Sequence, residues 1–234
     1  MALGSHKARA KSVVAGAGVL VPFGDVVRAG EMPRVAPPAV VKPVDGDNSL
    51  GVTLVRERDR FAAAVEGACG HGSAALVESY VELGREVRCG IIVRDGELVG
   101  LPLEEYHVDR CEKPIRVASD KIQRGADGEL TLVAKVRTKA WIVDEDDPVT
   151  EAVWDAARRC HEALGCRHYS LFDFRIDPDG RPWFLEGSLY CSFARQSVIA
   201  VMAAAAGIAT DELFAIVLGN ALPAHAVLAR KVAL

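Results

Sequence analysis

Residues 169–188 alternate between apolar and polar side chains on either side of Asp179-Gly180, and this pattern restricts the fold more than any other feature of the chain. An Asp-Gly pair between alternating strands favours a hairpin with a two-residue turn. Such a turn would set Asp173 directly opposite Glu186. One face of the hairpin would be wholly apolar, consisting of Phe172, Phe174, Ile176, Trp183 and Leu185. The chain is therefore predicted to contain an antiparallel sheet with a buried face.

The other face of this hairpin would hold two carboxylates side by side. Asp173 and Glu186, at about 5 Å, would repel each other by about 3 kcal/mol at an effective dielectric constant near 20. A divalent cation could offset this repulsion, because Mg²⁺ is usually held by one or two carboxylates that leave positions open for phosphate oxygens. A salt bridge from Arg175 and a raised pKa of one acid are the alternatives. Spacing alone leaves all three open.

The rest of the pattern predicts strands that are joined by hairpins and covered by helices. Apolar spacing predicts helices over residues 7–16, 57–69, 149–164, 193–206 and 211–218. Strands are predicted over residues 19–22, 39–42, 51–55, 74–81 and 85–103, the last of these folded at Asp95-Gly96. Strands connected in this way, with helices on their faces, are typical of an α+β fold.

A basic segment stands out in a chain of net negative charge. Residues 110–139 hold eight lysines and arginines against four acidic residues, whereas the whole chain carries a formal charge of −4. The acidic balance gives no uniform positive field for nucleic acid or an anionic membrane, so neither partner is expected. The basic segment indicates an anionic ligand, with an ordinary solvated loop as the alternative.

The sequence favours a cytoplasmic protein with reduced thiols. The six cysteines show neither a CxxC pair nor a zinc-type spacing. No stretch reaches the roughly 18 apolar residues of a membrane span. Residues 7–23 imitate a signal peptide in having a basic start and an apolar run, but glycines and a proline interrupt that run.

Two further stretches carry residues suited to a nucleotide. Lys42 ends an apolar strand and precedes the small-residue loop 45–51, where backbone amides could approach a phosphate. The GxxxxGK[ST] order of a P-loop is absent, and a plain β-turn would look similar. Glu78 and Glu86 flank a short segment that contains Gly84, and in most chains they would be surface acids.

Taken together and in order, these segments resemble the ATP-grasp superfamily, and most closely its D-alanine–D-alanine ligase branch. HKARAKSVVAGAGVLVP is similar to that family's DK-x-x-x-K-x-x-x-x-x-AG-x-x-x-P, and PPAVVKPVDGDNSLGV to its VVKP-x-x-x-GSS-x-G. LVESYVELGREV is similar to E-x-x-x-x-G-x-E, and DFRIDPDGRPWFLEGS to D-x-x-x-D-x-x-G followed by LE-x-N. The resemblance spans nearly the whole chain.

The resemblance implies that ATP binds with a divalent cation, Mg²⁺ or Mn²⁺. Asp173 and Glu186 would hold the metal, with Ser188 where the family has a third ligand, an asparagine. The residues implied in nucleotide binding are Lys7 and Lys42 at the phosphates, Asn48 and Ser49 in the loop over them, Glu78 at the adenine amino group, Val81 in the hinge, and Glu86 at the ribose hydroxyls.

The resemblance also implies two α+β lobes that grip the nucleotide. Residues 37–104 would form the small lobe and residues 105–234 the large lobe, with a basic flap at about 106–144, after a helix and strand in residues 1–36. The family's N-terminal α/β domain would be absent, so a partner or a neighbouring domain would supply it. A homodimer is a further expectation.

The implied activity is ATP-dependent ligation of a carboxylate to an amine through an acyl phosphate, with amino acids or small peptides as substrates. Lys135 in the flap and Ser197 would bind the carboxylate of the second substrate. Leu171 stands where the family has an oxyanion-stabilising arginine, for which Arg175 could compensate, and Cys191-Ser192 replaces a Pro-Gly pair. An ATP-binding module with degenerate or partner-dependent catalysis is the alternative.

Overall fold

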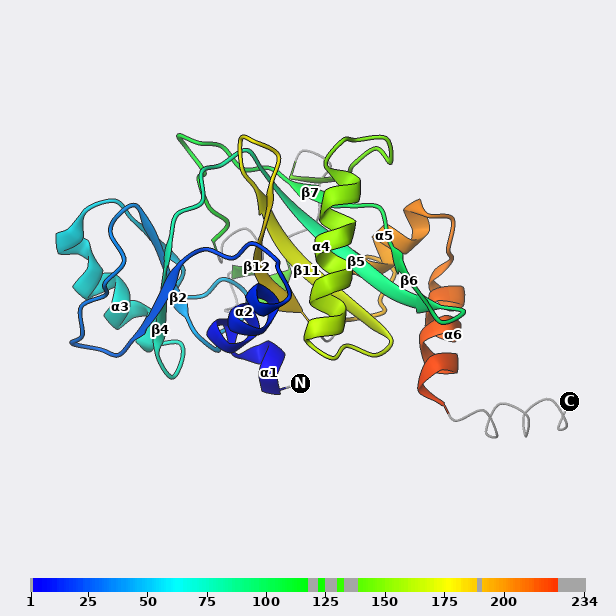
Figure 1. Ribbon diagram of the computed structural model, residues 1–234, viewed down its shortest axis with the longest axis horizontal. Coiled ribbons are helices and arrows are strands. Elements are labelled where there is room, and N and C mark those ends of the chain that lie inside the picture. Colours follow the sequence, from blue (N-terminus) through cyan, green and yellow to red (C-terminus); the bar gives the residue numbers. More distant parts are fainter. Residues whose placement is uncertain (1, 118–121, 125–129, 133–138, 189–190, 223–234) are drawn as a thin grey trace, which may run out of the picture.

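The structure, a computed structural model, describes residues 2–117, 122–124, 130–132, 139–188 and 191–222. Two sheets of unequal size lie side by side, and helices pack on both of them (Figure 1). The α+β class predicted from the sequence is therefore confirmed.

The smaller sheet is antiparallel and comes from the first part of the chain. Its strand order is β1 (Gly24–Val27), β4 (Ala75–Ser79), β2 (Ala39–Pro43) and β3 (Thr53–Val55). The 3₁₀ turn η1 (Arg58–Arg60) leads into α3 (Phe61–Cys69), which packs on β2 and β4. This helix buries, at the predicted helical spacing, Phe61, Ala64, Val65 and Ala68.

The first predicted strand is wrong in its position. Residues 19–22 contribute a single bridge between Leu20 and Trp183, and the strand begins later, at Gly24. Pro22 has no amide hydrogen to donate to a ladder, which explains why regular pairing does not include it.

The larger sheet carries the hairpins predicted from the sequence. Its strand order is β10 (Ala140–Ile142), β7 (Glu104–Tyr106), β5 (Arg85–Arg94), β11 (Tyr169–Ile176) and β12 (Pro182–Ser188), with β6 (Glu97–Gly100) also paired to β5. β5 and β6 turn at Asp95-Gly96, where φ is 54° and 87°, as a type I′ turn requires. A separate hairpin, β8 (Ile122–Arg124) with β9 (Leu130–Leu132), lies within the basic segment.

Helices cover both faces of the larger sheet (Figure 1). α4 (Thr150–Ala163) and α2 (Lys7–Gly16), which follows the short α1 (Ala2–Ser5), pack on the face where Phe172 enters the main core. α5 (Val198–Ala205) and α6 (Thr210–Ala221) bury the opposite face, which carries Leu171. Successive residues of a strand point to opposite faces of the sheet. Phe172 therefore packs toward α2 and α4, and its neighbour Leu171 packs toward α5 and α6.

The β11–β12 hairpin sets the predicted carboxylates opposite each other, but its turn and its register differ from those predicted. The predicted two-residue turn is wrong: the Asp177 amide donates to the Arg181 carbonyl at 3.1 Å across a wider turn, in which Gly180 has a φ of 82°. A β-bulge beside Asp173 then shifts the register back. Asp173 is therefore paired with Glu186, as predicted.

The bulge also changes which residues share a face. Leu185, predicted to lie on the apolar face, instead lines the same cleft as Glu186. Phe184 takes its place in the main core, with its ring centroid 6.0 Å from that of Phe172 and 6.1 Å from that of Phe174. Trp183, also predicted for the apolar face, is instead paired with Arg175 and donates from its indole nitrogen to Asp177 Oδ2 at 2.9 Å. The hairpin thus keeps one apolar face, but Phe184 replaces both residues predicted for it on β12.

The two sheets do not coincide with the expected lobe boundaries, which stay a prediction. β1, from residues 1–36, belongs to the smaller sheet, whereas β5, from the expected small lobe 37–104, belongs to the larger one. The chain crosses between the sheets at residues 80–84, where the Gly84 amide donates to the Ile176 carbonyl at 3.0 Å.

No single helix among the described residues has both the length and the apolar character to cross a membrane. α5 and α6 reach that length and composition only as a pair, and they are bent by 108° at the break between them. Both bury apolar side chains in the core, Ile199 and Leu213 among them.

We expect Gly84→Ala to destabilise the fold, because a Cβ at this position would lie 2.8 Å from the carbonyl oxygens of Ile176 and Asp177. Overpacking against backbone lowers the free energy of unfolding by about 1–3 kcal/mol. Urea unfolding measures the change. Gly67→Ala is the control, because its Cβ meets nothing within 4 Å and alanine favours a helix, so stability should stay or rise by up to about 1 kcal/mol. Equal effects of the two substitutions would contradict the predicted clash.

Candidate functional site

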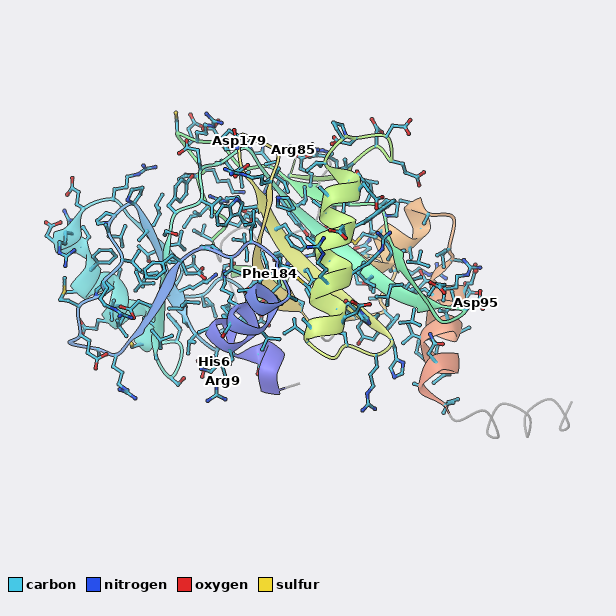
Figure 2. All side chains as sticks on the ribbon, viewed as in Figure 1. His6, Arg9, Arg85, Asp95, Asp179 and Phe184 are labelled. Atoms are coloured by element: carbon cyan, nitrogen blue, oxygen red, sulfur yellow. The ribbon has the colours of Figure 1, made fainter. Side chains whose placement is uncertain are left out.

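Helix α2 directs two lysines toward the junction of the sheets. Lys7 and Lys11 are one turn apart and therefore share a face of the helix, and both are buried. The Lys7 ammonium donates to the Gly46 carbonyl and lies 3.7 Å from Glu186 Oε2. Figure 2 shows His6 and Arg9 at the start of this helix, where the His6 ring caps it by accepting from the Arg9 amide at 3.3 Å.

A buried carboxylate on β4 is clamped by two lysines. Glu78 Oε1 lies 2.6 Å from Lys11 Nζ, and Oε2 lies 2.7 Å from Lys42 Nζ at the end of β2. Burial alone would raise the pKa of Glu78, but the two ammonium groups outweigh it and hold the pKa below its usual range. The Lys11 ammonium also donates to the Phe184 carbonyl at 3.0 Å, so this cluster ties the smaller sheet to β12 of the larger one.

Burial favours the neutral form of one of these lysines. Burial lowers the pKa of Lys11 to about 8, although the charge of Glu78 acts in the opposite direction. Phe184 lies beside α2 (Figure 2), and its ring centroid is 5.8 Å from Lys11 Nζ. Lys11 was not predicted as a site residue, and its position four residues after Lys7 on a helix was the signal that could have identified it.

The two hairpin carboxylates are surrounded by cations. The Arg88 guanidinium, on β5, forms a bidentate pair with Asp173, in which Nη2 lies 2.6 Å from Oδ2. Arg116 Nη1 lies 3.9 Å from Asp173 Oδ2, and Lys7 approaches Glu186. Neither arginine was predicted. Arg88 could have been found from its spacing, since it follows Glu86 by two residues and so shares its side of the strand.

Arg175 is engaged away from the Asp173–Glu186 pair. Its Nη2 is 2.8 Å from Glu86 Oε2, and Nη1 donates to the Val81 carbonyl at 3.3 Å. Its guanidinium carbon lies 5.2 Å from the centroid of the Tyr80 ring. The salt bridge to Asp173 that was one alternative for Arg175 is instead made by Arg88. The catalytic role expected for Arg175 stays a prediction.

Most of the predicted site residues line one cleft between the two sheets, with about 770 Å³ of space open to solvent. Arg116 and the apolar side chains of Val40, Leu185 and Ile115 complete its walls. The predicted residues that line it are Lys7, Lys42, Ser49, Glu78, Val81, Glu86, Asp173, Arg175 and Glu186.

The loop that follows β2 has strained backbone at the edge of this cleft. Asn48 and Ser49 have φ values of 55° and 57°, which are uncommon for residues other than glycine. Such strain persists where the surroundings impose it, often at ligand sites. Ser49 lines the cleft, whereas Asn48 is exposed.

Besides Asn48, three predicted residues are not shown at this cleft. Lys135 lies outside the described residues. Ser197 is the N-cap of α5, where its hydroxyl accepts from the Ala200 amide at 3.4 Å. Ser188 is paired with Leu171 at the end of β12 and is not among the residues that line the cleft.

The donor set suits a divalent cation that arrives with other ligands. Asp173 and Glu186 are adjacent carboxylates, the ligand type that Mg²⁺ prefers. Among the described residues, no group of three or more His, Cys, Asp or Glu side chains is arranged to hold a metal ion. A cation at this pair would therefore need further oxygen ligands from phosphate groups or water, which is how Mg²⁺ is usually held at phosphate sites.

Comparison with known proteins gives one family. The model of the D-ala D-ala ligase C-terminus matches residues 26–219. A D-alanine–D-alanine ligase of Mycobacterium bovis is 32% identical over 205 residues, which are 87% of this chain and 52% of the relative. The chain thus spans about half the length of that relative.

Solved structures show the same fold. A crystal structure of D-alanine–D-alanine ligase from Bacillus anthracis matches with a TM-score of 0.72 and 21% identity, over 93% of this chain and 67% of that one. The structure of the Bacillus anthracis enzyme complexed with ATP matches with a TM-score of 0.69 and 21% identity, over 93% of this chain and 64% of that one. The ATP-grasp fold expected from the sequence is confirmed.

We expect Lys11→Met to lower the free energy of unfolding by about 3 kcal/mol, because it leaves the buried Glu78 with fewer cations. Adding Glu78→Gln should recover at least about 1 kcal/mol, since the uncompensated charge is then removed. Urea unfolding of the two single variants and the double variant measures this coupling. Arg159→Met is the control, because its pair with Asp155 is exposed and should contribute less than about 1 kcal/mol. Additive effects at Lys11 and Glu78 would contradict the clamp.

Proposed function

The chain belongs to the family of the D-alanine–D-alanine ligase C-terminal domain, and on this premise we propose that it binds Mg-ATP in the cleft between its sheets and uses it to join a carboxylate to an amine. The observation that carries the proposal is the convergence of lysines, arginines and paired carboxylates on that one cleft. Cations on both sides of a carboxylate pair suit a triphosphate with its metal ion.

The nucleotide would lie with its base at the hinge between the sheets. Val81, Glu78 and Glu86 all line the cleft, and Glu78 reaches Lys42 at 2.7 Å, so its carboxylate would lie between the base and the phosphates. Carboxylates accept hydrogen bonds from the amino group of adenine and from ribose hydroxyls. Arg175 would hold Glu86 in place, because the two form a buried pair.

The triphosphate would extend toward α2 and the loop after β2. Lys7 and Lys42 line this end, and Ser49 lies in the loop beside them. Asp173, Glu186 and the Ser188 hydroxyl would hold Mg²⁺ or Mn²⁺, which would neutralise charge on the phosphoryl group that is transferred. The protein's own contribution is positioning and fixed positive charge, since phosphoryl transfer needs little covalent help.

The proposed reaction has two steps. An oxygen of the first substrate's carboxylate attacks the γ-phosphorus, and the bond to the β-phosphate oxygen breaks to release ADP. The amine of the second substrate then attacks the acyl carbon, phosphate leaves, and the amine loses a proton as the amide forms. Lys135, Ser197 and Arg175 are the residues we propose for substrate binding and charge stabilisation. Amino acids or small peptides are the proposed substrates.

A second candidate function is an ATP-binding module whose catalysis is degenerate or depends on a partner domain. Leu171 favours it. This side chain is packed with Ile199 and Met202 in the core beneath α5, so it offers no hydrogen-bond donor where the family has an arginine. The partner would supply the part of the relatives that this chain does not match.

We expect Glu186→Gln to weaken Mg-ATP binding about tenfold to a hundredfold, because it removes one charged ligand of the proposed cation. Isothermal titration of the purified chain with ATP in the presence and absence of Mg²⁺ measures this. Asp179→Asn is the control, since it removes an exposed carboxylate at the tip of the same hairpin (Figure 2) and should leave the affinity unchanged. Equal affinities for Mg-ATP in wild type and Glu186→Gln would contradict the assignment.

Turnover separates the two candidate functions. If the chain ligates, a panel of amino acids and dipeptides should give ADP release together with a new amide bond, detected by mass spectrometry, and Glu186→Ala should abolish both. Tight Mg-ATP binding without ADP release across the panel would support the binding module and contradict ligation by this chain alone.

A further inference from the structure

Asp173 already has a cation as its partner. The Arg88 guanidinium faces it across the β5–β11 ladder, where the two residues form a register pair, and both carboxylate oxygens take part. The side chains of Arg88 and Asp173 are only 11% and 7% exposed. A bidentate pair of this kind is among the stronger charge-assisted contacts in proteins.

The surroundings hold the Arg88 guanidinium in this position. Its central carbon lies 5.7 Å from the centroid of the Tyr106 ring. The Tyr106 hydroxyl in turn donates a hydrogen bond to the Glu104 carboxylate. An arginine guanidinium does not lose its proton in proteins. Arg88 therefore carries a fixed positive charge at Asp173.

Further cationic side chains lie beside the carboxylate pair. Asp173 and Glu186 have at least three cationic partners within 4 Å, namely Arg88, Arg116 and Lys7. Arg116 is stacked on the same Tyr106 ring, with its central carbon 3.5 Å from the ring centroid. A dication at Asp173 would have to compete with Arg88, because both Asp173 oxygens are already engaged.

We propose that Arg88 is a built-in counterion that keeps a divalent cation off Asp173 until a nucleotide is bound. This inference rests on the proposed function, because it takes the cation and the nucleotide to share the cleft. A nucleotide brings several negative charges and new oxygen ligands at once. Guanidinium binds phosphate as well as carboxylate in a bidentate manner, so Arg88 can exchange one anion for the other without becoming unpaired. Metal binding is then coupled to nucleotide binding by this one side chain.

The test is a titration of the nucleotide-free chain with Mn²⁺, followed by electron paramagnetic resonance of the free ion. Wild type should bind Mn²⁺ at least tenfold more weakly than Arg88→Met, which removes the cation and keeps the apolar stem. The double variant Arg88→Met/Asp173→Asn should lose this gain. Arg94→Met is the matched control, because it removes an arginine from the same strand whose partner, Glu212, lies outside the cleft, and it should bind Mn²⁺ as wild type does.

Arg88→Lys keeps the proposal testable if Arg88→Met does not fold. A lysine retains the charge and gives up the bidentate contact, so its Mn²⁺ affinity should exceed that of wild type about threefold or more. No gain in either folded variant, a gain that survives Asp173→Asn, or an equal gain in Arg94→Met would overturn the proposal.

A parallel titration separates this inference from the proposed function. With saturating ADP, wild type and Arg88→Met should bind Mn²⁺ with affinities within about threefold of each other. If Arg88→Met gains Mn²⁺ affinity but no variant binds ADP, the counterion role stands and the proposed function fails. If ADP binds but Arg88→Met gains nothing, the counterion role fails alone.

Discussion

The pairing of Asp173 with Glu186 across one hairpin is the constraint on which the arrangement of the cleft depends. Two adjacent carboxylates in a partly buried place require positive charge nearby. The fold supplies it from separate parts of the chain, with Lys7 on the N-terminal helix and Arg88 on the central strand of the larger sheet. The cleft is therefore electrostatically organised before any ligand is considered.

A second buried cluster fixes how the two sheets meet. Glu78 and Lys42 belong to the smaller sheet, and Lys11 joins them from α2 while donating to the backbone of Phe184 in the larger sheet. Removing any one of these groups would leave a charge buried without full compensation. Lys42 and Glu78 line the cleft, and Lys11 holds Glu78 from behind. The contacts that hold the sheets together therefore also shape the candidate nucleotide site.

Local sequence patterns predicted helices and turns well, but they predicted strand register and the partners of charged side chains less well. The helix over residues 7–16 and the turn at Asp95-Gly96 follow from spacing and turn chemistry, and both are confirmed. The pairing of Asp173 with Glu186 is correct although its premise is not, because a wider turn and a bulge offset each other. The spacing after Glu86 points to Arg88, but its partner Asp173 could not be chosen from the sequence, since that depends on which strand lies beside β5.

The central claim is that one cleft between the sheets holds a nucleotide with its cation. A crystal structure of the chain with Mg²⁺ and a non-hydrolysable ATP analogue tests it most directly. We expect the base beside Val81, the triphosphate beside Lys7 and Lys42, and the cation at Glu186. A nucleotide bound outside this cleft, or within it with its phosphates away from both lysines, would contradict the account.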